Sequence, residues 1–148
     1  MRKTFYFITF IAIISLFISS KVMASEIYVY KNPYCGCCNK WISYLKEKGY
    51  AVKSENTQML PAMKEAIGVT SELASCHTAV VDGYFLEGHV PADDIKRLLE
   101  ERPDIKGLAV PGMPIGSPGM EQGDIKERYD VMAVKKDGST YIYSTHNN

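Results

Sequence analysis

The sequence predicts a single α/β domain, and three observations support this prediction. The chain has 148 residues, a length that suits one domain. Strand-like and helix-like stretches alternate after residue 25, beginning with the β-branched and aromatic run Glu26 to Tyr30. The cysteine-rich stretch Tyr34-Cys35-Gly36-Cys37-Cys38-Asn39-Lys40 separates that run from the first helix-like stretch. We therefore expect the domain to span residues 25–148.

Residues 1–24 have the layout of a secretory signal peptide. A basic head, Met1-Arg2-Lys3, precedes an apolar run from Thr4 to Ser20, and Val22-Met23-Ala24 supplies small or aliphatic residues before a cleavage site after Ala24. The alternative is an uncleaved membrane anchor, but the apolar run is slightly shorter than the roughly 20 residues of a bilayer span. We expect cleavage, export to the periplasm and no stable membrane insertion.

The charge balance of the exported part disfavours two classes of partner. Residues 1–24 carry three basic residues and no acidic one, so residues 25–148 carry 14 basic and 17 acidic residues, a net charge of −3. This balance provides neither a basic face for nucleic acid nor a polybasic patch for a membrane surface.

The remaining elements follow from periodicity and from turn residues. Helices are expected at residues 39–48, at residues 57–67 with a start near Pro61, and at residues 90–102. Strands are expected at residues 50–54, in a hairpin of residues 75–81 and 84–88 around Asp82-Gly83, and in a last hairpin of residues 129–134 and 139–143. Residues 107–123, rich in glycine and proline, are expected to be irregular.

The expected order, strand-helix-strand-helix-strand-strand-helix, resembles the thioredoxin and glutaredoxin folds, which also carry cysteines between the first strand and the first helix. Glutaredoxins have a proline six residues before the glycine of the hairpin turn, and this proline faces the cysteine motif. Counting back six residues from Gly83 reaches His77. The resemblance therefore implies a thioredoxin-like α/β fold with an extra C-terminal β-hairpin, in which Cys76-His77 faces the cysteines.

Three cysteines at the start of a helix predict a site for a soft metal ion. Free N–H groups and the helix dipole stabilise thiolates there. Cys35 and Cys38 have the C-x-x-C spacing of a redox pair, but Cys37 could reshuffle any disulfide that they form. Converging thiolates select Cu(I), with zinc as the usual competitor, and they can bridge more than one copper ion. Structural disulfides are the alternative, although three thiols at one helix start are poorly placed to stabilise a fold by disulfide bonds.

Four motifs in sequence order resemble the exported CopG-type copper-resistance proteins, many of which are known only as domain of unknown function 411. The motifs are Cys35-Gly36-Cys37-Cys38, Ser75-Cys76-His77-Thr78, EGHVPADDI at residues 87–95 and AVPGMPIGSPGME at residues 109–121. The resemblance implies a copper site on the cysteines and a role in periplasmic copper handling. It also suggests a redox activity that interconverts the oxidation states of copper. The expected ligands are Cys35, Cys37, Cys38 and Cys76, assisted by His77.

The roles of the other candidates are less specific. Cys76 is expected to ligate metal; the alternatives are a buried strand cysteine or a disulfide with Cys37. His77 is expected to ligate, to orient Cys76 or to cap the strand. His89 is expected to make a structural hydrogen bond. For His146, in the polar tail, we expect no functional role.

The methionines and the tryptophan require a separate interpretation. Met113 and Met120 carry thioethers, which are soft ligands for Cu(I), in the segment rich in glycine and proline. Each alone is expected to fill a packing gap, and the segment as a whole is expected to cover the site as a lid. Met59 and Met63 are expected in the core because they can share a helix face, and Trp41 is expected there too.

Two other function classes remain open. A thiol–disulfide oxidoreductase would use Cys35 and Cys38, but the proline that forms the partner groove is missing. A structural zinc module would use Cys35, Cys37, Cys38 and Cys76. We expect adjacent Cys37 and Cys38 not to point easily at one tetrahedral ion, which disfavours zinc. The number of metal ions per chain separates these alternatives, and whether the chain is an enzyme stays open.

Overall fold

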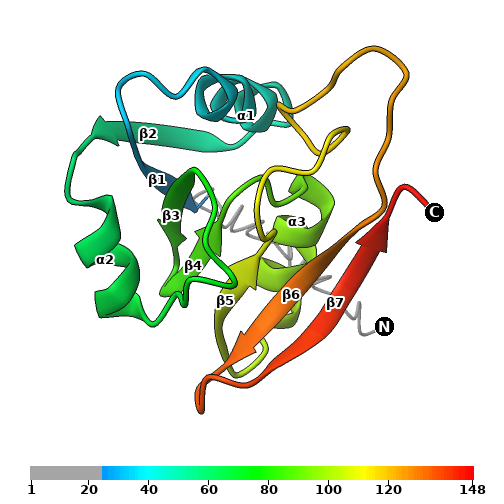
Figure 1. Ribbon diagram of the computed structural model, residues 1–148. Helices are drawn as coiled ribbons and strands as arrows, with labels where there is room; N and C mark the ends of the chain where they lie inside the picture. Colours follow the sequence, from blue (N-terminus) through cyan, green and yellow to red (C-terminus); the bar gives the residue numbers. More distant parts are fainter. Residues whose placement is uncertain (1–24) are drawn as a thin grey trace, which may run out of the picture.

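The computed structural model describes residues 25–148, so the predicted signal peptide at residues 1–24 lies outside the described residues (Figure 1). Within residues 25–148 there are three helices: α1 (Gly36–Glu47), α2 (Leu60–Ile67) and α3 (Ala92–Glu101). The same part of the chain holds seven strands: β1 (Glu26–Lys31), β2 (Ala51–Asn56), β3 (His77–Val81), β4 (Tyr84–Glu87), β5 (Ile105–Ala109), β6 (Tyr129–Lys135) and β7 (Thr140–His146).

All seven strands form one mixed sheet in the order β2-β1-β3-β4-β5-β6-β7. The pairs β1–β2 and β4–β5 are parallel, and the other neighbours are antiparallel. The fold is therefore a mixed α/β fold, as expected, and its sheet extends well beyond β1 to β4. Figure 1 shows the β6–β7 hairpin at the end of the sheet opposite β2.

The side-chain alternation of the strands gives the sheet two apolar faces. On one face, Leu86 and Leu108 belong to the main core, which includes Trp41 of α1 and Ile95 of α3. Their neighbours on the opposite face, such as Phe85 and Ala109, belong to a smaller core that Ile67 of α2 packs against. Helices α1 and α3 therefore cover one face of the sheet, and α2 covers part of the other.

Strand β5 is the main departure from the expected elements. Its last three residues fall in the segment that was expected to be irregular, so that expectation is wrong at residues 107–109. Gly107 breaks the strand signal in the sequence because glycine has no side chain to contribute. Its role is steric: a Cβ at Gly107 would collide with Phe85 of the neighbouring strand β4. The glycine thus permits the close approach of the two strands.

The other elements follow the expected pattern closely. The Asp82-Gly83 turn joins β3 to β4, with positive φ angles of 47° and 86°, and the last hairpin is present as β6 and β7. Trp41 is fully buried and donates a hydrogen bond of 2.9 Å from Nε1 to the carbonyl oxygen of Val90. Met59, however, is 64% exposed, so its expected place in the core is wrong. It stands at the N-cap position of α2, where its side chain makes no capping hydrogen bond.

No helix within residues 25–148 has the length and apolar character needed to cross a membrane.

Candidate metal site at the start of helix α1

The three clustered cysteines sit where the chain turns from β1 into α1. Cys35 is the N-cap residue of α1, and its Sγ atom accepts a hydrogen bond from the backbone N–H of Cys38 at 3.3 Å. Cys37 and Cys38 lie in the first turn, where the backbone N–H groups of a helix lack partners within the helix. The helix start therefore directs all three side chains to one place.

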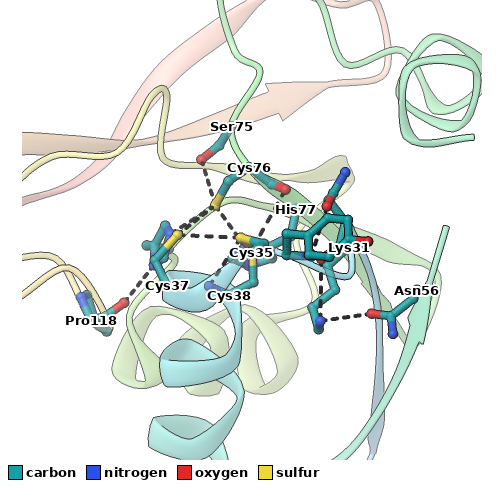
Figure 2. The surroundings of a disulfide bond; sticks show 12 residues. Lys31, Cys35, Cys37, Cys38, Asn56, Ser75, Cys76, His77 and Pro118 are labelled. Carbon is teal, nitrogen blue, oxygen red and sulfur yellow. Dashed lines mark hydrogen bonds between the residues drawn. A yellow bond between two sulfur atoms is a disulfide. The ribbon is translucent and has the colours of Figure 1, made fainter. Parts of the chain in front are cut away.

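The fourth cysteine comes to the same place from the start of β3. Figure 2 shows the sulfur of Cys76 facing those of Cys35 and Cys37. The Cys37 and Cys76 sulfurs are 3.8 Å apart, and the Cys35 and Cys37 sulfurs are 3.5 Å apart. All four sulfurs lie within 4.8 Å of one another. Cys76 thus lies opposite the cysteine motif, as the sequence predicted.

The four cysteines differ in redox state. Cys35 and Cys38 are joined by a disulfide bond, whereas Cys37 and Cys76 are free thiols. The C-x-x-C pair predicted from the spacing is therefore able to form its disulfide in this fold. Reduction of that bond would make four thiols available at the same position.

Two histidines adjoin the Cys76 sulfur and form a second group with metal-binding geometry. His77 Nδ1 is 3.3 Å and His89 Nε2 is 3.0 Å from Cys76 Sγ. His89 also makes the structural hydrogen bond expected of it, since its Nδ1 lies 2.8 Å from the carbonyl oxygen of Pro118. With N–H at Nδ1, the Nε2 lone pair of His89 faces Cys76.

The contact between His89 and Cys76 was missed at the level of the sequence, although a signal for it exists. The Asp82-Gly83 turn pairs Val81 with Tyr84, and β3 and β4 run away from the turn as an antiparallel pair. Extending that register by five residues on each side places Cys76 opposite His89. Counting outward from the turn would therefore have predicted the contact.

Burial affects the protonation of these groups. The pKa of His77 lies well below its usual value chiefly because of burial, and also because a protonated His89 and the charged Lys64 would each repel a proton on His77. Burial also lowers the pKa of His89, so both imidazoles are neutral at pH 7 and can offer a lone pair. For Cys76, burial and the neighbouring Cys37 raise the pKa to about 12. A metal ion must therefore displace a proton from Cys76.

One buried imidazole nitrogen of the site has no hydrogen-bond partner among the described residues, which fits a site for a soft metal ion. His77 is fully buried, and its Nε2 atom has no hydrogen-bond partner among the described residues. Trp41 packs against the His77 ring with centroids 4.4 Å apart, so the imidazole is fixed in orientation. Thiolate and imidazole together are the donors that suit copper and zinc.

Residues 110–120, which we call the strap, run past this site. The strap is tied to the loop before β3 by a hydrogen bond of 3.2 Å from the N–H of Gly112 to the carbonyl oxygen of Ala74. Its Pro118 carbonyl accepts the hydrogen bond from His89 described above. The segment therefore contacts the site through His89. Its expected role as a lid over the metal stays a prediction.

Gly119 brings the strap into direct contact with α1. A Cβ at this position would lie 3.0 Å from the carbonyl oxygen of Cys37 and 2.8 Å from the backbone nitrogen of Trp41. The two methionines of the strap are not equally accessible, since Met113 is 51% exposed and Met120 is half-buried. Ligation of metal by Met113 or Met120 stays a prediction.

The sulfurs of adjacent Cys37 and Cys38 both belong to the four-cysteine group within 4.8 Å. Cys38 is fully buried in the first turn of α1, and Cys37 is half-exposed beside it. The expectation that these two residues do not point easily at one tetrahedral ion stays a prediction.

Comparison with known proteins supports a copper-related family. The model of the family described as "Protein of unknown function, DUF411" matches residues 73–120. Two solved structures, titled "Copper resistance protein copG- Form 2" and "Copper resistance protein copG- Form 1", match with TM-scores of 0.80 and 0.79. Each is 43% identical and covers 83% of this chain and 98% of its own. No curated protein sequence matches significantly.

The fold and the site define a mixed α/β protein with a thiol-rich cluster that could hold a soft metal ion. Given the identity and the coverage, the chain belongs to the family of CopG-type copper-resistance proteins, as its motifs predicted.

Proposed function

We propose that this protein binds copper as Cu(I) through Cys35, Cys37, Cys38 and Cys76, and that it serves copper resistance and homeostasis. The observation that carries the proposal is the convergence of four cysteine sulfurs within 4.8 Å at the start of α1. Thiolates are soft ligands that select Cu(I). Membership of a family that includes a copper-resistance protein supports the choice of copper.

The number and arrangement of donors favour more than one copper ion. A thiolate sulfur can bridge two metal ions, and Cys76 belongs both to the four-cysteine group and to the group with His77 and His89. In this proposal Cys76 links the two groups, His77 assists as predicted, and His89 joins the ligand set. The total ligand set then exceeds what a single tetrahedral ion requires.

The cellular setting and the fold family belong to the same proposal. We infer export to the periplasm through a cleaved signal peptide at residues 1–24, where copper-handling proteins would be the partners. The order β1-α1-β2-α2-β3-β4-α3 and the position of the cysteines after β1 support a thioredoxin-like core. The strands β5 to β7 then extend that core.

The Cys35–Cys38 disulfide supports a redox role beside binding. Formation of the disulfide from two thiols releases two electrons and two protons. Two Cu(II) ions can accept those electrons and become two Cu(I) ions. The same two residues would thus reduce copper in one state and ligate it in the other.

The test is a metal titration of reduced residues 25–148 without oxygen, with Cu(I) and zinc in parallel and metal content read by mass spectrometry. The Cys37→Ser variant is expected to lose most of its copper while it still forms the Cys35–Cys38 disulfide, because Cys37 is free in the structure. Asn39→Ser, an exposed neighbour without sulfur, is the control. Full copper occupancy in Cys37→Ser would show that the cluster is not the binding site.

A second candidate function is thiol–disulfide exchange, which the Cys35–Cys38 disulfide specifically favours. That function predicts no retained copper and a disulfide that exchanges with added dithiols. A structural zinc module predicts one zinc ion per chain and preference for zinc in the parallel titration. Several copper ions per chain, lost on Cys76→Ser, would exclude both alternatives.

A further inference from the structure

A buried ion pair lies behind the loop that carries Cys76. Lys64 of α2 and Glu87 at the end of β4 are in contact, with side chains that are 13% and 0% exposed. Lys64 Nζ also donates a hydrogen bond of 2.9 Å to Thr78 Oγ1. Both partners lie outside the two groups of candidate metal ligands.

The Glu87 carboxylate holds the chain on both sides of Cys76-His77. Its Oε1 accepts a hydrogen bond of 2.6 Å from the backbone N–H of Ser75. Its Oε2 accepts one of 2.6 Å from the hydroxyl of Thr78. The residue before Cys76 and the residue after His77 are thus fixed by one carboxylate, whose charge is balanced by Lys64.

The loop has further supports that point to accurate placement of Ser75. A Cβ at Gly88 would lie 2.6 Å from Ser75 Cβ, so the Ser75 side chain packs against the Gly88 backbone at a distance that only glycine permits. The hydroxyl of Ser75 donates to the carbonyl oxygen of Gly112 in the strap. Ser75, directly beside Cys76, therefore donates one hydrogen bond to the Glu87 carboxylate and another to the strap.

A buried ion pair is a poor means of adding stability, because removing two charges from water offsets much of their attraction. Such pairs serve better to select one arrangement among several, since any other arrangement would leave a buried charge without a partner. In this fold the arrangement that the pair selects is the register of the Cys76 loop relative to α2 and β4.

We propose that the Lys64–Glu87 ion pair positions Cys76 opposite Cys37 and couples helix α2 to the metal site. Any effect of the ion pair on copper binding rests on the proposed function. Its effect on the position of the Cys76 sulfur does not rest on that function, because the sulfur has this position in the metal-free protein. The pair acts through hydrogen bonds to Ser75 and Thr78, and neither residue hydrogen-bonds a proposed metal ligand, so Lys64 and Glu87 are positioning residues.

The test measures the proximity of the two sulfurs directly. In a Cys35→Ser, Cys38→Ser background of residues 25–148, diamide removes two electrons and two protons from Cys37 and Cys76 and joins them. The rate of this reaction reports how often the sulfurs, 3.8 Å apart in the structure, meet. Lys64→Met and Glu87→Gln are expected to slow it about tenfold or more, because small displacements of reacting groups have large effects on rate.

Three further variants separate positioning from general loss of stability. Val131→Ala removes core volume on β6, three strands away from β3, and is expected to leave the rate unchanged. Lys64→Arg keeps the positive charge beside Glu87 and is expected to react at the rate of the parent with Lys64. The Lys64→Met, Glu87→Gln double variant leaves no unpaired charge, and is expected to fold and to react slowly even where a single variant fails to fold.

The outcomes are distinct from those of the copper titration. Reaction of the folded double variant at the rate of its parent would overturn the proposal, as would a loss in Lys64→Met no larger than that in Val131→Ala. If the unaltered protein takes up no copper, the proposed function fails while the crosslinking rates still decide the role of the ion pair. If copper binds and the rates fall as expected, copper occupancy should fall in the same variants.

Discussion

Cys76 is the residue at which the parts of the site meet. Its sulfur lies 3.8 Å from Cys37 on one side and 3.0 Å from His89 Nε2 on another. It is buried enough to hold its proton, since its pKa is raised to about 12. Metal binding at Cys76 therefore includes the loss of a proton, and a neighbouring neutral imidazole is a suitable acceptor or co-ligand.

The role of His89 can be tested by a substitution that separates its two contacts. The amide of asparagine can take the place of the Nδ1 atom, which bonds Pro118, but it cannot reach the position of Nε2 beside Cys76. We therefore expect His89→Asn to lower copper affinity about 10- to 100-fold, the range seen when partners of metal ligands are removed. Competition with a Cu(I) chelator measures this affinity.

The control for that experiment is His146→Asn, since His146 bonds Asp94 and lies outside both candidate metal groups. It should leave the copper affinity unchanged. Equal affinity in His89→Asn and the unaltered protein would mean that His89 serves only the bond to Pro118.

At the scale of elements, the site is an assembly of three segments that are distant in the chain. Helix α1 supplies three cysteines at its start, the β3–β4 hairpin supplies Cys76 and both histidines, and the strap contacts His89 through the Pro118 carbonyl. The strap has no regular secondary structure, so its place depends on a few contacts. Among these the close approach of Gly119 to α1 is the most restrictive.

Gly119→Ala is expected to displace the strap from α1. The new methyl group would lie 2.8 Å from the backbone nitrogen of Trp41, and moving helix backbone atoms out of its way costs free energy. We expect a loss of about 1–3 kcal/mol in the free energy of unfolding, measured by urea denaturation. We also expect faster alkylation of Cys37, because the strap covers its side of the helix.

Gly112→Ala is the matched control for the strap. Gly112 also has a positive φ, 67° against 86° for Gly119, but a Cβ there would meet nothing within 4 Å. The control therefore carries the backbone strain of the substitution without the collision. If both variants lose the same stability and Cys37 reacts alike in both, the contact between the strap and α1 has no special role.

At the scale of the molecule, periodicity and turn residues were sufficient to predict most of the fold. The Asp82-Gly83 hairpin follows from two local residues, and α1 follows from Trp41 and Leu45 at helical spacing. Strand β5 was missed because its place depends on β4 and β6 on either side, not on its own short sequence.

The candidate site divides in the same way. Three of its cysteines lie within the four residues 35–38, and the expected topology placed Cys76 opposite them, so the sequence predicted all four. The roles of His89, Lys64 and Glu87 depend on contacts between residues that are 9 to 23 positions apart in the chain. Local patterns do not encode such contacts, although the hairpin register could have revealed the first of them.

The buried histidines give the whole metal-free molecule a predictable pH dependence. The pKa values of His77 and His89 are lowered in the folded state, so the unfolded chain binds more protons once the pH falls below its ordinary value of 6.5. Their contribution to stability is therefore present above pH 6.5 and is lost on acidification, by at most ~1.4 kcal/mol per pH unit for each histidine. Urea unfolding at several pH values, followed by Trp41 fluorescence, measures this loss.

Cys76 acts with the opposite sign at the alkaline end. Its pKa is raised from 9.0 to about 12, so its contribution is complete below pH 9.0 and is lost as the pH rises towards 12. The metal-free protein with its Cys35–Cys38 disulfide intact should thus be most stable between about pH 7 and 9. His89→Asn should flatten the acid side of the profile, and Cys76→Ser the alkaline side. An acid side that is equally steep in His89→Asn would show that other groups cause the acid sensitivity.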